Sequence, residues 1–212
     1  DSRISLFNIL PDNKNENEIS GKIIDNCHKH HKRILNKYFK ISNEFKLCRN
    51  TTTMKELWNI HKGNMARIGG KYKPLHFFEK IEKIFDIGKE YDIYSIKKGD
   101  LLAATLLIFY FKDTVEYFTP AINEDFRKYQ PLNFLIYETM IDVVKRKDIK
   151  IWNWGGTWNS QEGLYTYKKR WGAKESSYKY YINCNLEFLK NYKQEEIIEN
   201  YPNYYLVPFN KI

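Results

Sequence analysis

The residue types best suited to chemistry lie between Ile151 and Ala173. A glycine pair, Gly155-Gly156, follows an apolar strand-like run, and glycine there permits a positive φ or lets a ligand approach the backbone. Aromatic and cationic side chains then alternate at Tyr165, Tyr167, Lys168, Lys169, Arg170 and Trp171. Aromatic faces beside fixed cations suit a ligand that carries both bases and phosphates. The same cations also suit the last turn of a helix that ends at Gly172, so a structural interpretation stays open.

A second group of reactive side chains, Cys27-His28-Lys29-His30-His31, raises the question of a metal. Cys27 and His31 are four residues apart, so on one helix they would share a face. A metal site needs further ligands, and the remaining histidines, His61 and His76, are isolated in the sequence. The sequence therefore predicts a basic helix face here and no metal site.

The composition favours an anionic partner. The 212 residues carry a formal net charge of +9, which suits nucleic acid, a nucleotide or an anionic membrane surface. Three widely spaced cysteines do not form a disulfide framework, so we expect a reducing, cytoplasmic location. The longest apolar run, Leu101 to Phe111, is too short for the ~20 residues that span a bilayer.

Hydrophobic periodicity predicts the elements that must position these residues. Strands are predicted at residues 3–10, 45–49, 91–97, 101–111, 114–119, 149–154 and 178–183. Helices are predicted at residues 19–39, 53–66, 75–85 and 132–147, then before Trp171 and from Leu186 to about Tyr192. Short polar links join the strands between residues 91 and 119 into an antiparallel meander. The order predicts an α+β fold: a mixed, mostly antiparallel sheet flanked by helices, with the site where two strand ends splay apart.

The order of elements is similar to the GNAT acyltransferase fold, and the C-terminal motif resembles that of the FemABX-like branch. That motif combines the glycine pair after a strand with the aromatic-lysine pair Tyr167-Lys168 and then Trp171-Gly172. Two upstream stretches also agree with the family. His31–Lys37 resembles its basic opening helix, and Asn64–Gly69 with Phe77-Phe78 resembles its substrate-side helices. The resemblance covers roughly residues 25–183.

The resemblance implies transfer of an aminoacyl group from charged tRNA, or of an acyl group from a thioester, to an amine. Many members build peptidoglycan cross-bridges, and others modify polysaccharides or small molecules. Tyr167 and Lys168 stand where the family contacts the tRNA end, although the family usually has phenylalanine at the first position. The donor is already activated, so no metal or other cofactor is required.

The reaction that the resemblance implies suggests roles for the remaining candidate residues. Lys168 or Arg170 would neutralise a phosphate or a developing oxyanion, with the glycine pair close to the donor. Asn153 and Thr157 would supply polar contacts to the acceptor, and Arg67 would bind its phosphate or carboxylate. The candidate bases are Glu116, Glu138 and Glu162, each of which is alternatively a solvated surface charge.

The loop Asn123–Pro131 bears on the donor because it lacks glycine. CoA-using relatives place a glycine-containing loop here, whose backbone N–H groups bind the pyrophosphate. The loop therefore favours aminoacyl-tRNA over acyl-CoA, with Arg127 and Lys128 able to contact phosphates by their side chains.

Three hypotheses about function follow. The favoured one is an aminoacyl- or acyltransferase that acts on the amine of a cell-wall or surface-polysaccharide precursor. The alternatives are an acyl-CoA-dependent N-acetyltransferase that acts on an amino sugar or other small amine, and a non-catalytic RNA-binding module.

We expect residues 1–20 to be an N-terminal strand or the remnant of a preceding GNAT-like half. Residues 21–185 would form the acyltransferase domain and residues 186–212 a C-terminal helix and aromatic tail. The oligomeric state stays open.

Overall fold

The computed structural model describes residues 3–12, 15–158, 160–177, 183 and 185–200. The chain divides into two compact units, Asp1–Ser176 and Ser177–Ile212. The described part of the second unit contains the short helices α7 (Leu186–Leu189) and α8 (Gln194–Asn200). The boundaries expected after residues 20 and 185 stay predictions. None of the described helices is both long and apolar enough to cross a membrane.

The first unit is built on a mixed sheet with the strand order β2-β3-β4-β5-β6-β1-β7. Its strands are β1 (Arg3–Ile9), β2 (Phe45–Arg49), β3 (Tyr91–Lys98), β4 (Leu101–Phe111), β5 (Thr114–Ile122), β6 (Ile151–Trp158) and β7 (Lys174–Ser176). The predicted meander is confirmed, because β2 to β5 pair antiparallel in sequence order. Only the β5–β6 pair is parallel among the described strands. This architecture confirms the predicted fold class.

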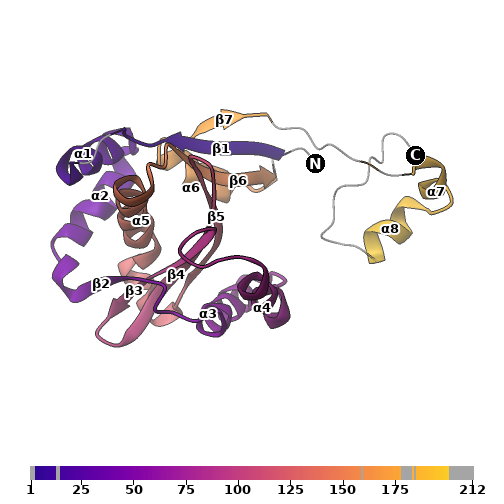
Figure 1. Cartoon of the computed structure of the whole chain (residues 1–212), viewed down its shortest axis with the longest axis horizontal. Coiled ribbons are helices and arrows are strands. Elements are labelled where there is room, and N and C mark those ends of the chain that lie inside the picture. The colour runs from indigo at the N-terminus through magenta and orange to yellow at the C-terminus, as the bar shows by residue number, and fades with distance from the viewer. Residues whose placement is uncertain (1–2, 13–14, 159, 178–182, 184, 201–212) are drawn as a thin grey trace. The chain divides into compact units, whose positions relative to one another are not determined.

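Helices cover both faces of this sheet (Figure 1). One face carries α1 (Glu16–Asn26), α2 (Lys29–Phe39) and α5 (Pro131–Lys147). The other carries α3 (Met54–Arg67) and α4 (Leu75–Ile84). Helix α6 (Glu162–Arg170) contacts β6 and α2. Helix α3 begins with a capping box, in which the Thr53 hydroxyl accepts from the Glu56 N–H and the Glu56 side chain accepts from the Thr53 N–H.

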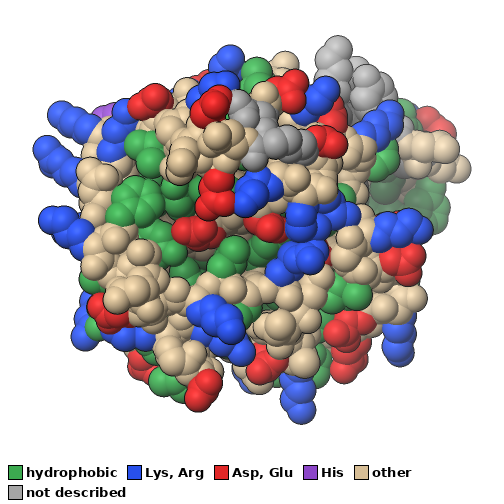
Figure 2. All heavy atoms as spheres, turned by 60° about the vertical axis from the view of Figure 1, so that its left-hand side comes forward, with side chains coloured by type: hydrophobic (Ala, Val, Ile, Leu, Met, Phe, Trp, Pro, Cys, Tyr) green, Lys and Arg blue, Asp and Glu red, His purple; other side chains and the backbone are tan. Residues whose placement is uncertain are grey.

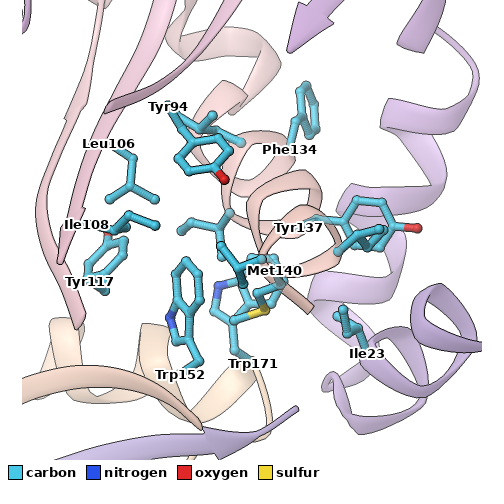
Figure 3. Packing of buried hydrophobic residues seen from close by; sticks show 14 of the residues in the cluster. Ile23, Tyr94, Leu106, Ile108, Tyr117, Phe134, Tyr137, Met140, Trp152 and Trp171 are labelled. Carbon is cyan, nitrogen blue, oxygen red and sulfur yellow. The ribbon is translucent and has the colours of Figure 1, made fainter. Parts of the chain in front are cut away.

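The larger core lies between the sheet and α5 (Figure 3). Tyr117 of β5 and Trp152 of β6 belong to the same buried cluster as Phe134 and Met140 of the helix. All four are at most 8% exposed. A smaller cluster, which includes Phe78, fills the space on the α3–α4 side. Because strand side chains alternate between faces, each strand residue is committed to one of these two layers.

The predicted helix over residues 19–39 is wrong in one respect: it is two helices. Cys27 and His28 have extended backbones, and the His28 ring nitrogen Nδ1 accepts the N–H of His30 at the start of α2. The His28 N–H donates to the Arg170 carbonyl oxygen at 2.8 Å, so the break is fixed by α6. The metal interpretation required Cys27 and His31 to lie on one helix, and they do not.

Two strand predictions also need correction. Strand β6 does not end at Trp154 but continues through the glycine pair to Trp158 because it pairs with β1. The glycines thus lie within a strand, not in a turn. The predicted strand over residues 178–183 falls almost entirely outside the described residues, which omit 178–182 and 184. Strand β7 (Lys174–Ser176) comes just before it in the sequence.

Candidate active site

The site begins where β5 and β6 separate. The two strands pair in parallel at Thr114–Ile151, Val115–Trp152 and Glu116–Asn153. Beyond these pairs β5 continues with β4, and β6 continues with β1. The register of β1 against β6 shifts between Ser5 and Phe7, beside Gly155, whose φ is +69°. The predicted splay is therefore present, and a positive-φ glycine sits at its opening.

Lys168 reaches this opening from α6. Its Nζ donates to the Trp154 carbonyl oxygen and to Thr157 Oγ1, each at 2.8 Å, and the residue is 3% exposed. Burial, reinforced by the nearby Arg3 guanidinium, lowers the pKa of Lys168 to about 8, while the Glu116 carboxylate opposes the shift. An ammonium group has three donors, and the described residues accept from two of those of Lys168.

Glu116 faces the same opening from β5. Its Oε2 accepts from Asn153 Nδ2 at 3.5 Å, and a Cβ added to Gly155 would lie 3.8 Å from its Oε1. Loss of solvation raises the pKa of Glu116, and the Lys168 ammonium opposes the rise. A carboxylate and an ammonium that perturb each other at a strand opening are a pair suited to proton transfer.

The two predicted acceptor contacts on β6 have internal partners. Asn153 Oδ1 accepts the Gly155 N–H at 3.0 Å while its amide nitrogen faces Glu116. Thr157 is 1% exposed, and its hydroxyl holds Lys168. These residues therefore orient the glutamate and the lysine, and a direct acceptor contact stays a prediction.

Tyr167, the residue before Lys168, lines a pocket of about 320 Å³ that is called the cationic pocket below. Its lining comes from α2, the segment before α5, the first turn of α5 and the end of α6: His30, His31, Ile34, Ile122, Arg127, Gln130, Leu132, Asn133, Tyr167 and Arg170. Three of the predicted donor residues thus meet in one pocket: Arg127, Tyr167 and Arg170.

The first turn of α5 forms one wall of the cationic pocket. Gln130 precedes it in the left-handed conformation, with φ 55° and ψ 48°, and its side chain makes no capping hydrogen bond. The positive end of a helix dipole attracts anions, although in this turn Pro131 has no N–H and the Asn133 N–H donates to the Gln130 carbonyl oxygen at 3.0 Å. The glycine-free loop therefore still forms a left-handed turn before the helix, although with the cost of a side chain at that conformation.

Tyr167 forms another wall. Its hydroxyl donates to Asn133 Oδ1 at 3.0 Å, and its ring meets the His31 ring edge-on at a centroid distance of 5.4 Å. The sequence indicates only a metal ligand or the start of a basic helix at His31. In the fold it is 2% exposed, and neither ring nitrogen has a hydrogen-bond partner among the described residues. Burial, reinforced by His30, lowers the pKa of His31 to about 4, so its ring is neutral near pH 7.

Other predicted residues lie apart from the splay. Glu138 accepts from the Tyr38 hydroxyl at 3.0 Å on the α5 side of the sheet, whereas Glu116 alternates with the buried Val115 and Tyr117 and so faces the opposite side. Lys128 lies over the Tyr129 ring at 5.1 Å and does not line the cationic pocket. Glu162 begins α6 as an exposed residue.

Arg67 and Arg127 share one carboxylate. Arg127 Nε donates to both oxygens of Glu124, at 2.9 and 2.7 Å, and Arg67 Nε lies 3.0 Å from Oε2 of the same side chain. The predicted acceptor arginine and one predicted donor arginine are therefore neighbours. Among the described residues, no group of three His, Cys, Asp or Glu side chains is arranged to hold a metal ion.

The sequence and the fold agree on a family. The profile of the acetyltransferase (GNAT) domain matches residues 26–169, so the chain belongs to the GNAT acetyltransferase domain family. A comparison with curated proteins finds no match.

Solved structures share the fold at low sequence identity. FemX has 15% identity and a TM-score of 0.63, with 82% of this chain and 59% of FemX covered. A conserved protein of unknown function from Bacteroides thetaiotaomicron has 9% identity and a TM-score of 0.56, with 79% and 55% covered. The C-terminal domain of a putative lysylphosphatidylglycerol synthetase from Agrobacterium fabrum has 10% identity and a TM-score of 0.52, with 81% and 57% covered. The chain thus spans less than two thirds of each.

Proposed function

We propose that the chain is the acyltransferase part of an enzyme that moves an aminoacyl group from tRNA to an amine. The observation that carries the proposal is that Glu116 and Lys168 both lie at the splay, close enough for each charge to act on the pKa of the other. Tyr167, the residue before Lys168, lines a pocket together with Arg127 and Arg170. Membership of the GNAT family supports acyl transfer as the reaction class. The proposed acceptor is an amine of a cell-wall or surface-polysaccharide precursor.

The reaction needs alignment and proton transfer more than activation, because the donor ester is already reactive. The acceptor nitrogen attacks the acyl carbon, and the bond from that carbon to the leaving oxygen breaks. Glu116 takes the proton that the amine loses. The remaining N–H of Lys168 stabilises the developing oxyanion, and with a pKa of about 8 its ammonium can return a proton to the leaving oxygen.

The cationic pocket suits the phosphate-bearing end of the donor. Arg170 supplies a positive charge, and the N-terminus of α5 adds the positive end of the helix dipole. Outside the pocket, α2 carries further exposed cations at Lys29, Arg33 and Lys37. A polyanion longer than the pocket would use these cations, which favours a nucleic acid as the donor.

Acyl-CoA is the second candidate donor, and the left-handed Gln130 favours it. This residue allows the segment before α5 to make the turn that glycine makes in CoA-using relatives, so the positive end of the α5 dipole can face a pyrophosphate. The two donors then differ in their use of the exposed cations of α2.

A transfer assay tests the proposal. Transfer of a labelled amino acid from aminoacyl-tRNA to a panel of primary amines is expected. Acetyl transfer from acetyl-CoA in place of this reaction would establish the second donor. Binding of tRNA with no transfer from either donor would show a non-catalytic RNA-binding module and overturn the proposal.

The matched variants are Lys168→Met and Lys169→Ala, which alter neighbouring residues of α6. Loss of one donor to a developing oxyanion typically costs about 10²–10³-fold in turnover, and we expect this for Lys168→Met. Lys169 pairs with Glu175 at 3.1 Å, so Lys169→Ala should stay within about twofold. Lys168→Met also removes hydrogen bonds to two buried acceptors, so thermal melting must confirm its fold. Full activity of a folded Lys168→Met would exclude a central role for this lysine.

A further inference from the structure

An apolar groove of about 490 Å³ lies between α4 and the strands β4 and β5, on the face of the sheet opposite to α5. Three phenylalanine rings form its floor. Phe77 and Phe118 stack with an interplanar angle of 17°, and Phe109 meets Phe118 edge-on at a centroid distance of 5.1 Å. The rim includes Ile84, the last residue of α4, which is 68% exposed.

The groove leads to the proposed catalytic carboxylate. Glu116 is the acid among its described lining residues, and Phe118, two residues further along β5, shares its face. The same Glu116 contacts Asn153 at the splay, so groove and splay are continuous through one side chain. A molecule that lies in the groove with an amine at its inner end therefore places that amine at Glu116.

On the basis of the proposed function, we propose that the acceptor is an amphipathic amine: a primary amine on an apolar chain or ring that occupies this groove. Charge complementarity sets the direction, because an ammonium group pairs with Glu116 before it loses its proton. The aromatic floor offers no hydrogen-bonding side chain to a hydroxyl group. A polyhydroxylated amine such as an amino sugar would therefore lose solvation there without compensation, so of the two proposed acceptors the groove favours the amine of a cell-wall precursor over that of a polysaccharide precursor.

Two lysine side chains lie at the groove or against its aromatic floor. Lys80 lines its rim on α4. Lys73 Nζ lies 5.2 Å from the centroid of the Phe118 ring and 5.9 Å from that of the Phe77 ring, two of the rings that form the floor. An acidic group at the far end of the acceptor would pair with Lys80, so an amphipathic amine with a distal anion fits best.

The experiment measures n-alkylamines from ethylamine to octylamine, both as acceptors in the transfer assay and as ligands by calorimetry without donor. Each buried methylene contributes ~0.8 kcal/mol, so affinity should rise about fourfold per carbon until the groove is filled. Ile84→Ser should lower affinity for octylamine by about fivefold and leave ethylamine unchanged. Ile9→Ser changes an isoleucine on β1 that is 56% exposed and should leave both unchanged.

The two proposals fail differently. Absence of transfer to any amine, with the chain-length dependence of binding intact, would overturn the proposed function and keep the groove as an amine site. Affinity independent of chain length, or equal loss in Ile84→Ser and Ile9→Ser, would overturn the inference. A change of sedimentation coefficient in Ile84→Ser alone would show instead that the groove is an interface between two copies of the chain.

Discussion

At the scale of single residues, the site depends on a buried ammonium group, that of Lys168, and a carboxylate, that of Glu116, whose charges act on each other. Loss of solvation raises the pKa of Glu116 and lowers the pKa of Lys168 to about 8, and each charge opposes the shift of the other. The raised pKa makes the Glu116 carboxylate a stronger base for the proton of the acceptor amine, and the lysine can give up its proton near neutral pH. Neither shift is visible from the sequence positions of the two residues.

Glu116 and Glu138 provide a direct comparison between the two candidate bases. Glu116→Gln is expected to lower kcat by about 10²–10⁴-fold, because the amide cannot accept the proton. Glu138→Gln should retain activity within about twofold, since Glu138 lies on the α5 side and its amide oxygen can still accept from Tyr38. Steady-state kinetics of both variants decides between them. An equal loss in Glu138→Gln would contradict the assignment.

The pH dependence follows from the same pair. Glu116 must be deprotonated, so kcat/KM rises as the pH passes its raised pKa. Lys168 must be protonated, so kcat/KM falls as the pH rises through about 8. Titration of the acceptor is common to all variants and cancels in the ratio of wild type to variant. The ratio of wild type to Glu116→Gln should therefore rise with pH through the raised pKa of Glu116, whereas the ratio of wild type to Glu138→Gln should not change with pH in this range.

At the scale of elements, the position of α6 is set where it meets the α1–α2 junction. Gly172 follows α6 with a φ of +79°, as the sequence predicted for a C′ glycine. The Gly172 N–H donates to the Lys169 carbonyl oxygen at 2.9 Å. A Cβ on Gly172 would lie 2.4 Å from the carbonyl oxygen of Asn26, the last residue of α1. Tyr167 and Lys168 depend on this close approach for their positions.

Gly172→Ala tests this dependence. The left-handed backbone costs an alanine about 1–2 kcal/mol, and the contact with Asn26 adds to it. For a chain of this size 1 kcal/mol corresponds to ~2–4 °C, so we expect a fall in Tm of at least about 5 °C. Gly21→Ala lies within α1 in open space and should raise the free energy of unfolding by up to ~1 kcal/mol. Thermal melting that leaves Gly172→Ala unchanged would contradict the packing described.

At the scale of the whole molecule, the net charge of +9 is spread among charges of both signs. On the face in Figure 2, blue Lys and Arg side chains and red carboxylates are mixed both at the edge and toward the centre. Total charge therefore draws an anion to the molecule, while the cationic pocket must provide the specific contacts.

The salt dependence of tRNA affinity separates these contributions. Between 50 and 200 mM salt the affinity should fall steeply, and Arg170→Ala should reduce the slope of log K against log salt by about one. Lys147→Ala is the matched control, because Lys147 ends α5 at the opposite terminus and lies over the Tyr110 ring at 4.3 Å. Filter binding measures both. The same reduction in the two variants would show that Arg170 acts only through net charge.

Local patterns in the sequence determined most of the elements and the family. The capping box at Thr53, the short links of the meander and the helical spacing before Lys147 are signals between near neighbours, and the structure confirms them. The C-terminal motif indicated the GNAT family, which the profile match over residues 26–169 confirms.

Contacts between distant segments decided the rest. The break at Cys27-His28 depends on the carbonyl oxygen of Arg170, and the strand conformation of the glycine pair depends on pairing with β1. Glu116 and Glu138 look alike in the sequence, yet only the tertiary structure places the first at the splay and the second against α2. The physical reason is that the face a side chain occupies, and hence its solvation and partners, is set by the element that packs against it.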